Sequence, residues 1–318
     1  MSSATPVIAI VLPCYNEQDA LPITVPQLLA LLDDMVARAQ ISPDSFILCS
    51  NDGSRDNTWK TISSLHEADP RVRGISLAHN RGHQNALLAG LMYVRGKCDA
   101  AISIDADLQD DPQAIVRMIE LFRNDGDEIV YGVRASRQTD SWFKRTSAHA
   151  FYKLQRSMGV DTVFDHADYR LMSDRALDLL SEYGEVNLFL RGIVPHIGLK
   201  TGVVTYDRAH RVAGESKYPL SKMLSFSIDG ITSFSARPIR LIFMTGIILL
   251  LLDIIVSVWV LIAFFSHVAI SGWTSLMLSV WFLGSLILIG LGIIGEYVGK
   301  MYIEVKHRPR YAVAETIW

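Results

Sequence analysis

The sequence of 318 residues has few cysteines, little net charge and no basic segment ahead of an apolar core at its start. Three cysteines (Cys14, Cys49 and Cys98) are too few and too scattered for a disulfide framework or a zinc site, which fits a reducing compartment. A formal net charge of −3 gives no sign of a nucleic-acid partner, and we expect none. The first six residues predict no signal peptide.

Hydrophobic residues make up 50% of the chain, and the excess lies in two C-terminal runs. Residues 238–265 and 273–294 are each long enough to span a bilayer, which needs about 20 apolar residues. The connecting residues 266–272 carry no Lys or Arg, whereas the outer flanks carry Arg237, Arg240, Lys300, Lys306, Arg308 and Arg310. By the positive-inside rule, this predicts a transmembrane hairpin in an inner (cytoplasmic) membrane, with both of its ends in the cytoplasm.

Residues 7–132 alternate apolar runs with helical patterns. The runs predicted as strands are 7–12, 46–50, 72–77, 100–104 and 128–131. The patterns predicted as helices are 28–37, 58–65, 85–94 and 114–122. This alternation favours an α/β fold with a mostly parallel sheet and helices on both of its faces.

Two further helical patterns lie between this region and the apolar runs. Residues 141–158 and 220–234 have aromatic and aliphatic residues on one face with Lys and Arg nearby. Such helices suit a membrane surface, although ordinary core helices share the pattern. For residues 220–234 we favour the membrane interface, because they lead directly into the first apolar run.

An acidic segment, residues 105–112, follows the predicted strand 100–104. It begins Asp105-Ala106-Asp107-Leu108-Gln109, and Pro112 then opens the next helix. Carboxylates this close repel one another, so a divalent cation is their natural partner. A hard cation on Asp and Gln oxygens, with room for phosphate oxygens, is how proteins handle a nucleoside diphosphate.

Polar residues also follow the first two predicted strands. Tyr15 and Glu17 follow the first, and Asp52 and Asp56 follow the second. Because the carboxyl ends of parallel strands share one edge of a sheet, these residues predict the rim of a crevice. Tyr15 can stack on a base, while Glu17 and Asp52 can accept hydrogen bonds from a ribose or a base. Asp56 is better explained as an N-cap of the next helix.

These segments resemble family 2 glycosyltransferases with the GT-A fold. Within that family, the chain is similar to polyprenyl-phosphate glycosyltransferases, namely dolichol-phosphate mannose synthases and bacterial bactoprenol glucosyltransferases. The resemblance covers nearly the whole chain. Besides the two-span C-terminal region, the matching segments are 80–83 (Asn-Arg-Gly-His), 131–134 (Tyr-Gly-Val-Arg), 165–172 (Asp-His-Ala-Asp-Tyr-Arg-Leu-Met) and 211–218 (Arg-Val-Ala-Gly-Glu-Ser-Lys-Tyr).

The resemblance implies a division of the chain into four parts. Residues 1–140 would form the nucleotide-sugar-binding GT-A core, and residues 141–236 an acceptor-binding part with interfacial helices. Residues 237–295 would form the two transmembrane helices, and residues 296–318 a cytoplasmic tail. The catalytic domain and the C-terminus would then both be cytoplasmic.

The resemblance also implies roles for individual residues. The nucleotide-sugar pocket would be lined by Pro13, Tyr15, Glu17, Asp52 and Asp105. The metal, Mg²⁺ or Mn²⁺, would be held by Asp105, Asp107 and Gln109. The lipid phosphate would be gripped by Arg208, Arg211, Ser216 and Lys217. Arg134 and Asp168 would be the catalytic residues, and Arg134 would neutralise the donor or acceptor phosphate. Asp105 would alternatively contact the sugar or the nucleotide. Asp168 would act either as a base or as an orienting residue.

The implied reaction is inverting transfer of a hexose, most simply glucose from UDP-glucose, to undecaprenyl or another polyprenyl phosphate. GDP-mannose and a UDP-aminopentose are alternative donors, and O-antigen or lipopolysaccharide modification is the implied use. A processive polysaccharide synthase is disfavoured, because the chain has no Arg-Trp pair and only two predicted spans. A non-catalytic membrane scaffold is disfavoured because the acidic motifs are intact. A homo-oligomer and a flippase partner both stay open.

Overall fold

The computed structural model describes residues 5–107, 109–134, 166–186, 188–207 and 272–318, together with isolated positions between 239 and 258. The chain divides into two compact units. The first comprises Met1–Tyr152, Asp161–Pro219 and Arg308–Trp318, and the second comprises Lys153–Val160 and Leu220–His307.

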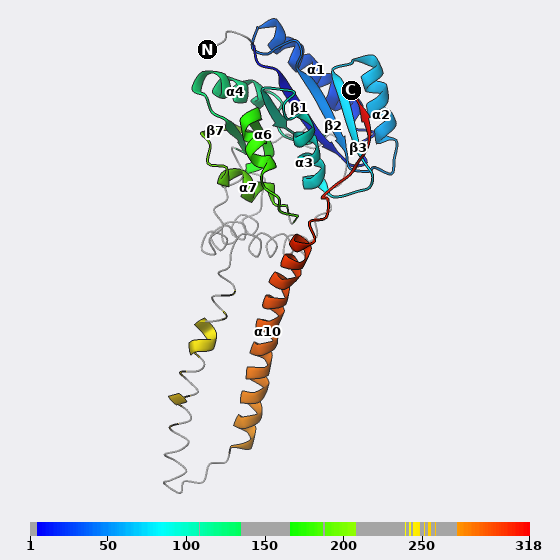
Figure 1. The fold of residues 1–318 in the computed structure, drawn as a ribbon. Helices are drawn as coiled ribbons and strands as arrows, with labels where there is room; N and C mark the ends of the chain where they lie inside the picture. Colours follow the sequence, from blue (N-terminus) through cyan, green and yellow to red (C-terminus); the bar gives the residue numbers. More distant parts are fainter. Residues whose placement is uncertain are drawn as a thin grey trace. The chain divides into compact units, whose positions relative to one another are not determined.

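An eight-stranded sheet lies at the centre of the first unit, in the order β7-β5-β6-β4-β1-β2-β3-β8 (Figure 1). The strands are β1 Ile8–Cys14, β2 Phe46–Asn51, β3 Val72–Leu77, β4 Ala100–Ser103, β5 Ile129–Arg134, β6 His166–Ser173, β7 Thr201–Tyr206 and β8 Val313–Ile317. The pairs β1/β2, β1/β4, β2/β3 and β5/β7 are parallel, whereas β3/β8, β4/β6 and β5/β6 are antiparallel. The predicted α/β fold with a mostly parallel sheet is confirmed.

Helices connect these strands, four of them at the predicted places, whereas the two helices between residues 174 and 196 were not predicted. They are α1 Leu21–Ala37, α2 Thr58–Ala68, α3 His83–Val94, α4 Ala114–Glu120, α6 Asp174–Ser181 and α7 Leu190–His196, and a π-helical turn at Leu121–Asp125 continues α4. Helix α1 begins at Leu21 rather than at residue 28, because Pro22 sits in its first turn, where a missing N–H has no cost.

The strands β1 and β2 form the centre of the core. Every residue of both strands is buried, as expected for a sheet covered on both faces. Helix α3 packs on this pair with a run of small and aliphatic residues, Ala86 to Leu91. Gly90 allows the closest approach, since a Cβ at this position would lie 2.5 Å from Cγ1 of Val11. This packing fixes α3, and therefore its first residue His83, relative to the ends of the strands.

Three strands extend the core beyond the predicted boundary at residue 140. β6 lies between β4 and β5, and β7 pairs with β5, so residues 166–206 include central parts of the sheet. The predicted tail 296–318 also differs from the structure, because it contains the end of a long helix and the edge strand β8. Insertion of an antiparallel strand between two earlier ones leaves no local sign in the sequence.

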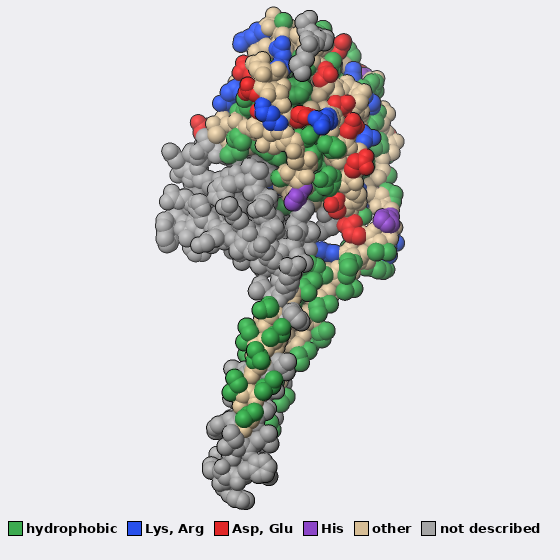
Figure 2. Space-filling view, turned by 60° about the vertical axis from the view of Figure 1, so that its left-hand side comes forward, with side chains coloured by type: hydrophobic (Ala, Val, Ile, Leu, Met, Phe, Trp, Pro, Cys, Tyr) green, Lys and Arg blue, Asp and Glu red, His purple; other side chains and the backbone are tan. Residues whose placement is uncertain are grey.

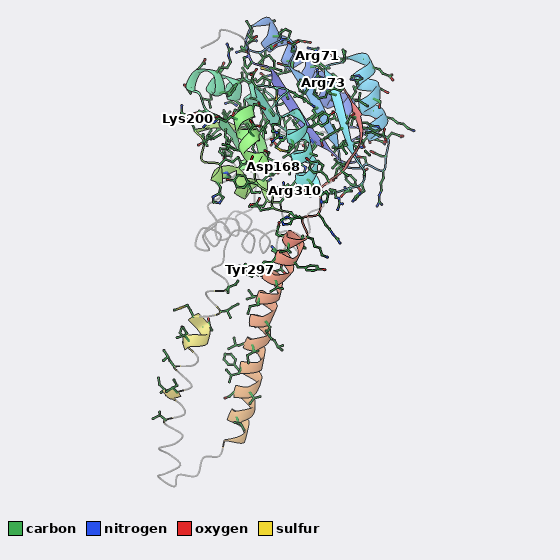
Figure 3. All side chains as sticks on the ribbon, viewed as in Figure 1. Arg71, Arg73, Asp168, Lys200, Tyr297 and Arg310 are labelled. Carbon is green, nitrogen blue, oxygen red and sulfur yellow. The ribbon has the colours of Figure 1, made fainter. Side chains whose placement is uncertain are left out.

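β8 is attached to the sheet by an aromatic and cationic cluster at its end. The Arg73 guanidinium (labelled in Figure 3) lies 4.1 Å from the ring centroid of Phe46 and 4.0 Å from that of Trp318. The Lys97 ammonium lies 3.7 Å from the ring of Tyr93 and 4.2 Å from that of Trp318. The Trp318 ring therefore contacts two cations and packs edge-to-face with two aromatic rings.

The second unit contains the helix α10, Trp273–Val305. Hydrophobic side chains line its described length (Figure 2, green). Within the described part of the chain, its segment Phe282–Val305 is the one long and apolar enough to cross a membrane, and only 6% of its most apolar stretch is buried. The first predicted span, 238–265, is described only at isolated positions, and the predicted interfacial helices 141–158 and 220–234 lie outside the described residues. The two-helix hairpin stays a prediction.

We predict that Trp318→Ala will destabilise the first unit by about 2 kcal/mol, because it removes two ring contacts and two cation–π contacts from a half-exposed side chain. This corresponds to a fall in Tm of about 4–8 °C by differential scanning calorimetry. Thr316→Ala, at an exposed position of the same strand, is the matched control and should shift Tm far less. Equal Tm values for the two variants would show that the cluster does not hold β8.

Candidate active site

The carboxyl ends of three strands meet at one edge of the sheet. The parallel register pairs Cys14 of β1 with Asn51 of β2, and Val11 of β1 with Ser103 of β4. The predicted site segments after residues 14, 51 and 103 therefore leave the sheet at the same edge. Asp168, at the start of the antiparallel β6, reaches this edge as well, because Arg170 pairs with Ser103. In Figure 3, Asp168 lies at the opposite end of the sheet from Arg71, which precedes β3.

The loops after β1 and β2 bind each other through side chains. The Asn16 backbone N–H donates to the Ser54 hydroxyl at 3.0 Å, and the Asn16 side chain accepts from the Arg55 N–H at 3.0 Å. The Glu17 N–H donates to the Thr58 hydroxyl at 2.8 Å. Pro13 is buried in β1, whereas Tyr15 is 40% exposed beside these loops. The exposed Tyr15 ring fits the predicted stacking on a base.

Asp56 stabilises the start of α2, as the sequence predicted, but it lies one residue before the N-cap position. Its Oδ1 accepts the backbone N–H of Thr58, the first residue of α2, at 3.0 Å, although the capping position itself is Asn57. Hydrogen bonds from the side chain and backbone of Thr58 and from Gln18 hold the pKa of Asp56 below its usual value, although partial burial acts in the opposite direction.

Asp52 organises the loop that leads into α3. Its carboxylate is buried and accepts the backbone N–H of Arg81 at 2.6 Å and of Gly82 at 2.8 Å. Burial raises the pKa of Asp52 despite these two bonds and the nearby His83 and His79. The structure shows a structural role for Asp52, which fixes the loop where α3 begins, and its predicted place in the nucleotide pocket stays a prediction.

Gly53 permits this arrangement. Its φ of +58° is disfavoured for other residues, and a Cβ there would lie 2.6–2.7 Å from the backbone of His79 and Asn80. The turn after β2 can therefore touch the loop before α3 only if residue 53 has no side chain.

The acidic segment follows β4 as predicted. The Asp107 Oδ1 accepts the backbone N–H of Gln109 at 3.3 Å, and the neighbouring Asp110 accepts the Tyr206 hydroxyl at 2.6 Å. Desolvation by the surrounding protein raises the pKa of Asp105 to about 6; His83 opposes the shift, and the carboxylates of Asp110, Asp168 and Asp107 add to it. This excess of negative charge is what a bound cation would relieve.

The donor atoms of this segment suit Mg²⁺ or Mn²⁺. Asp105, Asp107 and Gln109 offer hard oxygen ligands, and such cations usually complete their coordination with water and substrate phosphates. Among the described residues, no three His, Cys, Asp or Glu side chains converge as a complete metal site.

A second cluster of charge surrounds Asp168. Its Oδ1 accepts from Arg170 Nη2 at 2.6 Å and from Arg191 Nε at 3.3 Å, and its Oδ2 accepts from Arg191 Nη2 at 3.2 Å. Nε2 of His83 lies 3.6 Å from Asp168 Oδ2 and 3.7 Å from Asp105 Oδ1. Burial by itself would raise the pKa of Asp168, but Arg191, the His83 hydrogen bond and Arg170 outweigh it and hold this pKa well below its usual value. Asp168 is therefore a stable anion and a weak proton acceptor.

The remaining predicted site residues fall at the limits of the described chain. Arg134 ends β5 opposite Tyr206 of β7, and its side chain is outside the described part. The predicted lipid-phosphate grip, Arg208, Arg211, Ser216 and Lys217, also lies outside the described residues. Their roles stay predictions.

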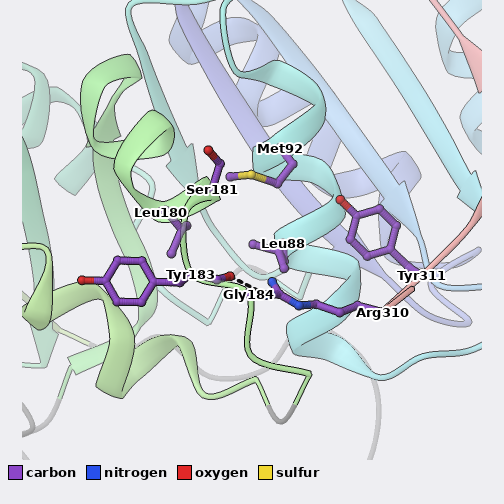
Figure 4. Close-up of a pocket in the computed structure, with 8 residues that line it drawn as sticks. All are labelled: Leu88, Met92, Leu180, Ser181, Tyr183, Gly184, Arg310 and Tyr311. Atoms are coloured by element: carbon purple, nitrogen blue, oxygen red, sulfur yellow. Dashed lines mark hydrogen bonds between the residues drawn. The ribbon is translucent and has the colours of Figure 1, made fainter. Parts of the chain in front are cut away.

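A separate open pocket of about 280 Å³ lies between α3, α6 and residues 310–311 (Figure 4). Leu88 and Met92 of α3 line one side, and the Arg310 guanidinium donates to the Tyr183 carbonyl oxygen across its mouth. Among the predicted site residues that the structure describes, none lines this pocket.

Comparison with known proteins identifies the family. The sequence model of "Glycosyl transferase family 2" matches residues 9–180. The chain is 49% identical over 313 residues to the uncharacterised glycosyltransferase YkoT of Bacillus subtilis (98% of this chain, 93% of that protein). This chain belongs to glycosyl transferase family 2. The glycosyltransferase is also 38% identical over 312 residues to the bactoprenol glucosyl transferase of Shigella phage SfV (96% of this chain, 97% of that protein).

A solved structure supports the fold of this glycosyltransferase. The mannosyl-3-phosphoglycerate synthase from Rubrobacter xylanophilus matches with a TM-score of 0.50 at 18% identity, covering 74% of each chain. At this identity the similarity concerns the GT-A fold alone. The predicted recognition of family 2 and of a glycosyltransferase is confirmed.

Sequence reasoning did not find Arg191 or the role of Gln84. Arg191 follows an apolar triplet, residues 188–190, and its partner Asp168 lies 23 residues earlier. Gln84 accepts the backbone N–H of Leu190, 106 residues away, at 3.0 Å. The sequence offered only the position of Gln84 directly after the matched segment 80–83.

We predict that Gly53→Ala will destabilise the glycosyltransferase by more than 2 kcal/mol and reduce its activity, because the new Cβ pushes the α3 loop away. Gly126→Ala is the matched control, since Gly126 has a similar φ of +69° with nothing within 4 Å of a Cβ. It should cost about 1 kcal/mol, the backbone effect alone. Chemical denaturation of both variants measures the difference, and equal losses would show that the contact with residues 79–80 is unimportant.

Proposed function

We propose that this glycosyltransferase transfers glucose from UDP-glucose to a polyprenyl phosphate such as undecaprenyl phosphate, with inversion at the anomeric carbon. One observation carries the proposal: His83 Nε2 lies within 4 Å of Asp105, in an acidic segment suited to a cation, and within 4 Å of Asp168, a carboxylate that two arginines bind. The acidic segment suits a nucleoside diphosphate with its cation, and the arginines around Asp168 suit a separate phosphate. The similarity to proteins named bactoprenol glucosyl transferases over nearly the whole chain supports the same substrates.

In this mechanism, Asp105, Asp107 and Gln109 would hold Mg²⁺ or Mn²⁺. A bound cation would neutralise charge on the departing nucleoside diphosphate. Tyr15 would stack on the base, while Pro13, Glu17 and Asp52 shape the pocket around the nucleoside. Asp105, the first residue of the acidic segment, would serve the sugar or the cation, and it lies 3.7 Å from Nε2 of His83.

The chemical step needs little proton transfer. An oxygen of the acceptor phosphate, already ionised at neutral pH, attacks the anomeric carbon from the face opposite the leaving group. A new carbon–oxygen bond forms, the bond to the donor's β-phosphate oxygen breaks, and its electron pair leaves with UDP. Positioning and electrostatic stabilisation then dominate catalysis. We assign Asp168 an orienting role, Arg134 a phosphate-neutralising role, and Arg208, Arg211, Ser216 and Lys217 the grip on the lipid phosphate.

The proposed setting is the cytoplasmic face of the inner membrane. The apolar and exposed helix α10 supports a membrane anchor, and the absence of Lys and Arg from residues 266–272 supports a hairpin. The acceptor phosphate lies in the headgroup layer, so a transferase anchored at that surface meets it directly. A homo-oligomer and a flippase that moves the product across the bilayer are compatible with this setting.

We predict that Asp107→Ala will lower transfer of labelled glucose into the organic phase by about 100-fold or more, in membranes supplied with UDP-glucose, undecaprenyl phosphate and Mn²⁺. EDTA should abolish the wild-type signal. Asp111→Asn is the matched control, because Asp111 lies in the same loop and contacts Gln113 and Arg117 instead. It should keep activity within a few-fold of the wild type.

The donor is tested by replacing UDP-glucose with GDP-mannose or a UDP-aminopentose. Transfer from only one of these two donors would support the proposed type of reaction but would show that the transferred sugar is not glucose. Absence of transfer from all three donors by the wild-type protein would contradict the proposal and favour the scaffold interpretation.

A further inference from the structure

Two guanidinium groups share the single carboxylate of Asp168. Arg170 is 1% exposed and Asp168 is 9% exposed, so these two form a buried pair on β6. Arg191 of α7 binds both oxygens of the same carboxylate, yet 43% of its side chain is exposed. The buried pair of Asp168 and Arg170 has no net charge, so Arg191 brings a further positive charge to the rim of the site.

The position of Arg191 is fixed by the residue before it. The N–H of Leu190 donates to Oε1 of Gln84 at 3.0 Å, and the Leu190 carbonyl oxygen accepts from Arg170 Nη1 at 3.4 Å. Gln84 belongs to α3 and follows His83 directly. Hydrogen bonds therefore join the start of α7 to the first turn of α3 and to Arg170 of β6, and they fix the backbone from which Arg191 reaches Asp168.

This arrangement is poorly explained by stability. Burying a charged pair costs desolvation that often exceeds the attraction gained, so a buried ion pair is weak support for a structural role. It is better explained by anion recognition, since a guanidinium has five N–H donors, and an arginine held against a carboxylate at the rim of a site still brings positive charge to a nearby phosphate. His83 Nε2 lies 3.7 Å from Asp105, which puts this cationic cluster next to the acidic segment where a diphosphate is expected.

We propose that Arg191 and His83, positioned by Asp168, bind a phosphate group of a substrate. Asp168 is then a positioning residue, and Arg191 and His83 contact the phosphate. The inference rests on the proposed function in one respect, namely that a substrate carries this phosphate. Two sources share its chemistry: the acceptor phosphate and the diphosphate of the donor.

The test compares Arg191→Gln with Arg191→Lys, and uses Arg175→Gln as the matched control. Arg175 is 70% exposed on α6 and pairs with Glu128. Loss of a charged hydrogen bond should raise the KM of one substrate roughly 10- to 100-fold in Arg191→Gln. Arg191→Lys should recover part of this loss, and His83→Asn should raise the same KM. Arg175→Gln should leave both KM values unchanged.

The constant that changes in Arg191→Gln shows whether the bound phosphate belongs to the acceptor or to the donor. A raised KM for undecaprenyl phosphate, with unchanged UDP-glucose binding by calorimetry, assigns the site to the acceptor. Weaker UDP-glucose binding, with an unchanged acceptor KM, assigns it to the donor diphosphate. Wild-type transfer together with unchanged constants in Arg191→Gln overturns the inference and leaves the proposed function intact.

Asp168→Asn separates positioning from base catalysis. The asparagine oxygen can still accept from Arg191, so a positioning role predicts a raised KM with kcat within about tenfold of the wild type. A catalytic base predicts a loss of kcat of about 100- to 10,000-fold with KM unchanged, which would overturn the role given to Asp168.

One measurement does not depend on turnover. Thermal-shift titrations with inorganic phosphate and with UDP should stabilise the wild type and Arg175→Gln, while Arg191→Gln responds to at least one of them much less. Equal responses in all three proteins would contradict the phosphate site even if no transfer were found. A failure of the proposed function, by contrast, would appear as absent transfer by a wild type that still shows the phosphate response.

Discussion

The buried ion pair of Asp168 and Arg170 is the interaction on which the candidate active site depends. Both side chains project from β6, two residues apart and therefore on the same face of the strand. The Ser103 hydroxyl donates to the backbone carbonyls of both residues, which joins the start of β6 to the end of β4. The acidic segment begins two residues after Ser103. The pair thus holds the cationic cluster beside the acidic one, and removal of either partner would leave a buried charge.

Most of the parallel part of the sheet could be predicted from the sequence. β1, β2, β3 and β4 are apolar runs separated by amphipathic helices, and burial on both faces makes such runs easy to recognise. β6 and β8 could not be predicted in the same way. β6 carries Asp168 and Arg170 in place of apolar residues, and these buried charges are tolerated because they pair with each other on one face of the strand. β8 is an exposed edge strand attached by Trp318 rather than by burial.

The site was predictable where its residues are neighbours in the sequence. Asp105, Asp107 and Gln109 occupy one short loop after a strand, so their clustering is visible without a structure. The role of Asp52 in holding Arg81 and Gly82 was not visible, because hydrogen bonds to backbone N–H groups leave no mark on the side chains of the donors. Arg191 was missed for a related reason. Its function depends on Gln84 and Asp168, which come from other elements.

The division of charge at the sheet edge suggests how one site can handle two anionic substrates. A carboxylate-rich loop repels phosphate unless a cation is present, whereas the arginines around Asp168 attract phosphate without one. His83 lies within 4 Å of a carboxylate on each side, at the boundary between the two regions. Two anions that must approach each other during transfer would then each meet a compensating charge of its own. In the reaction proposed above, the anionic Asp168 would matter for the geometry it imposes on Arg191, because an ionised acceptor phosphate would leave it no proton to remove.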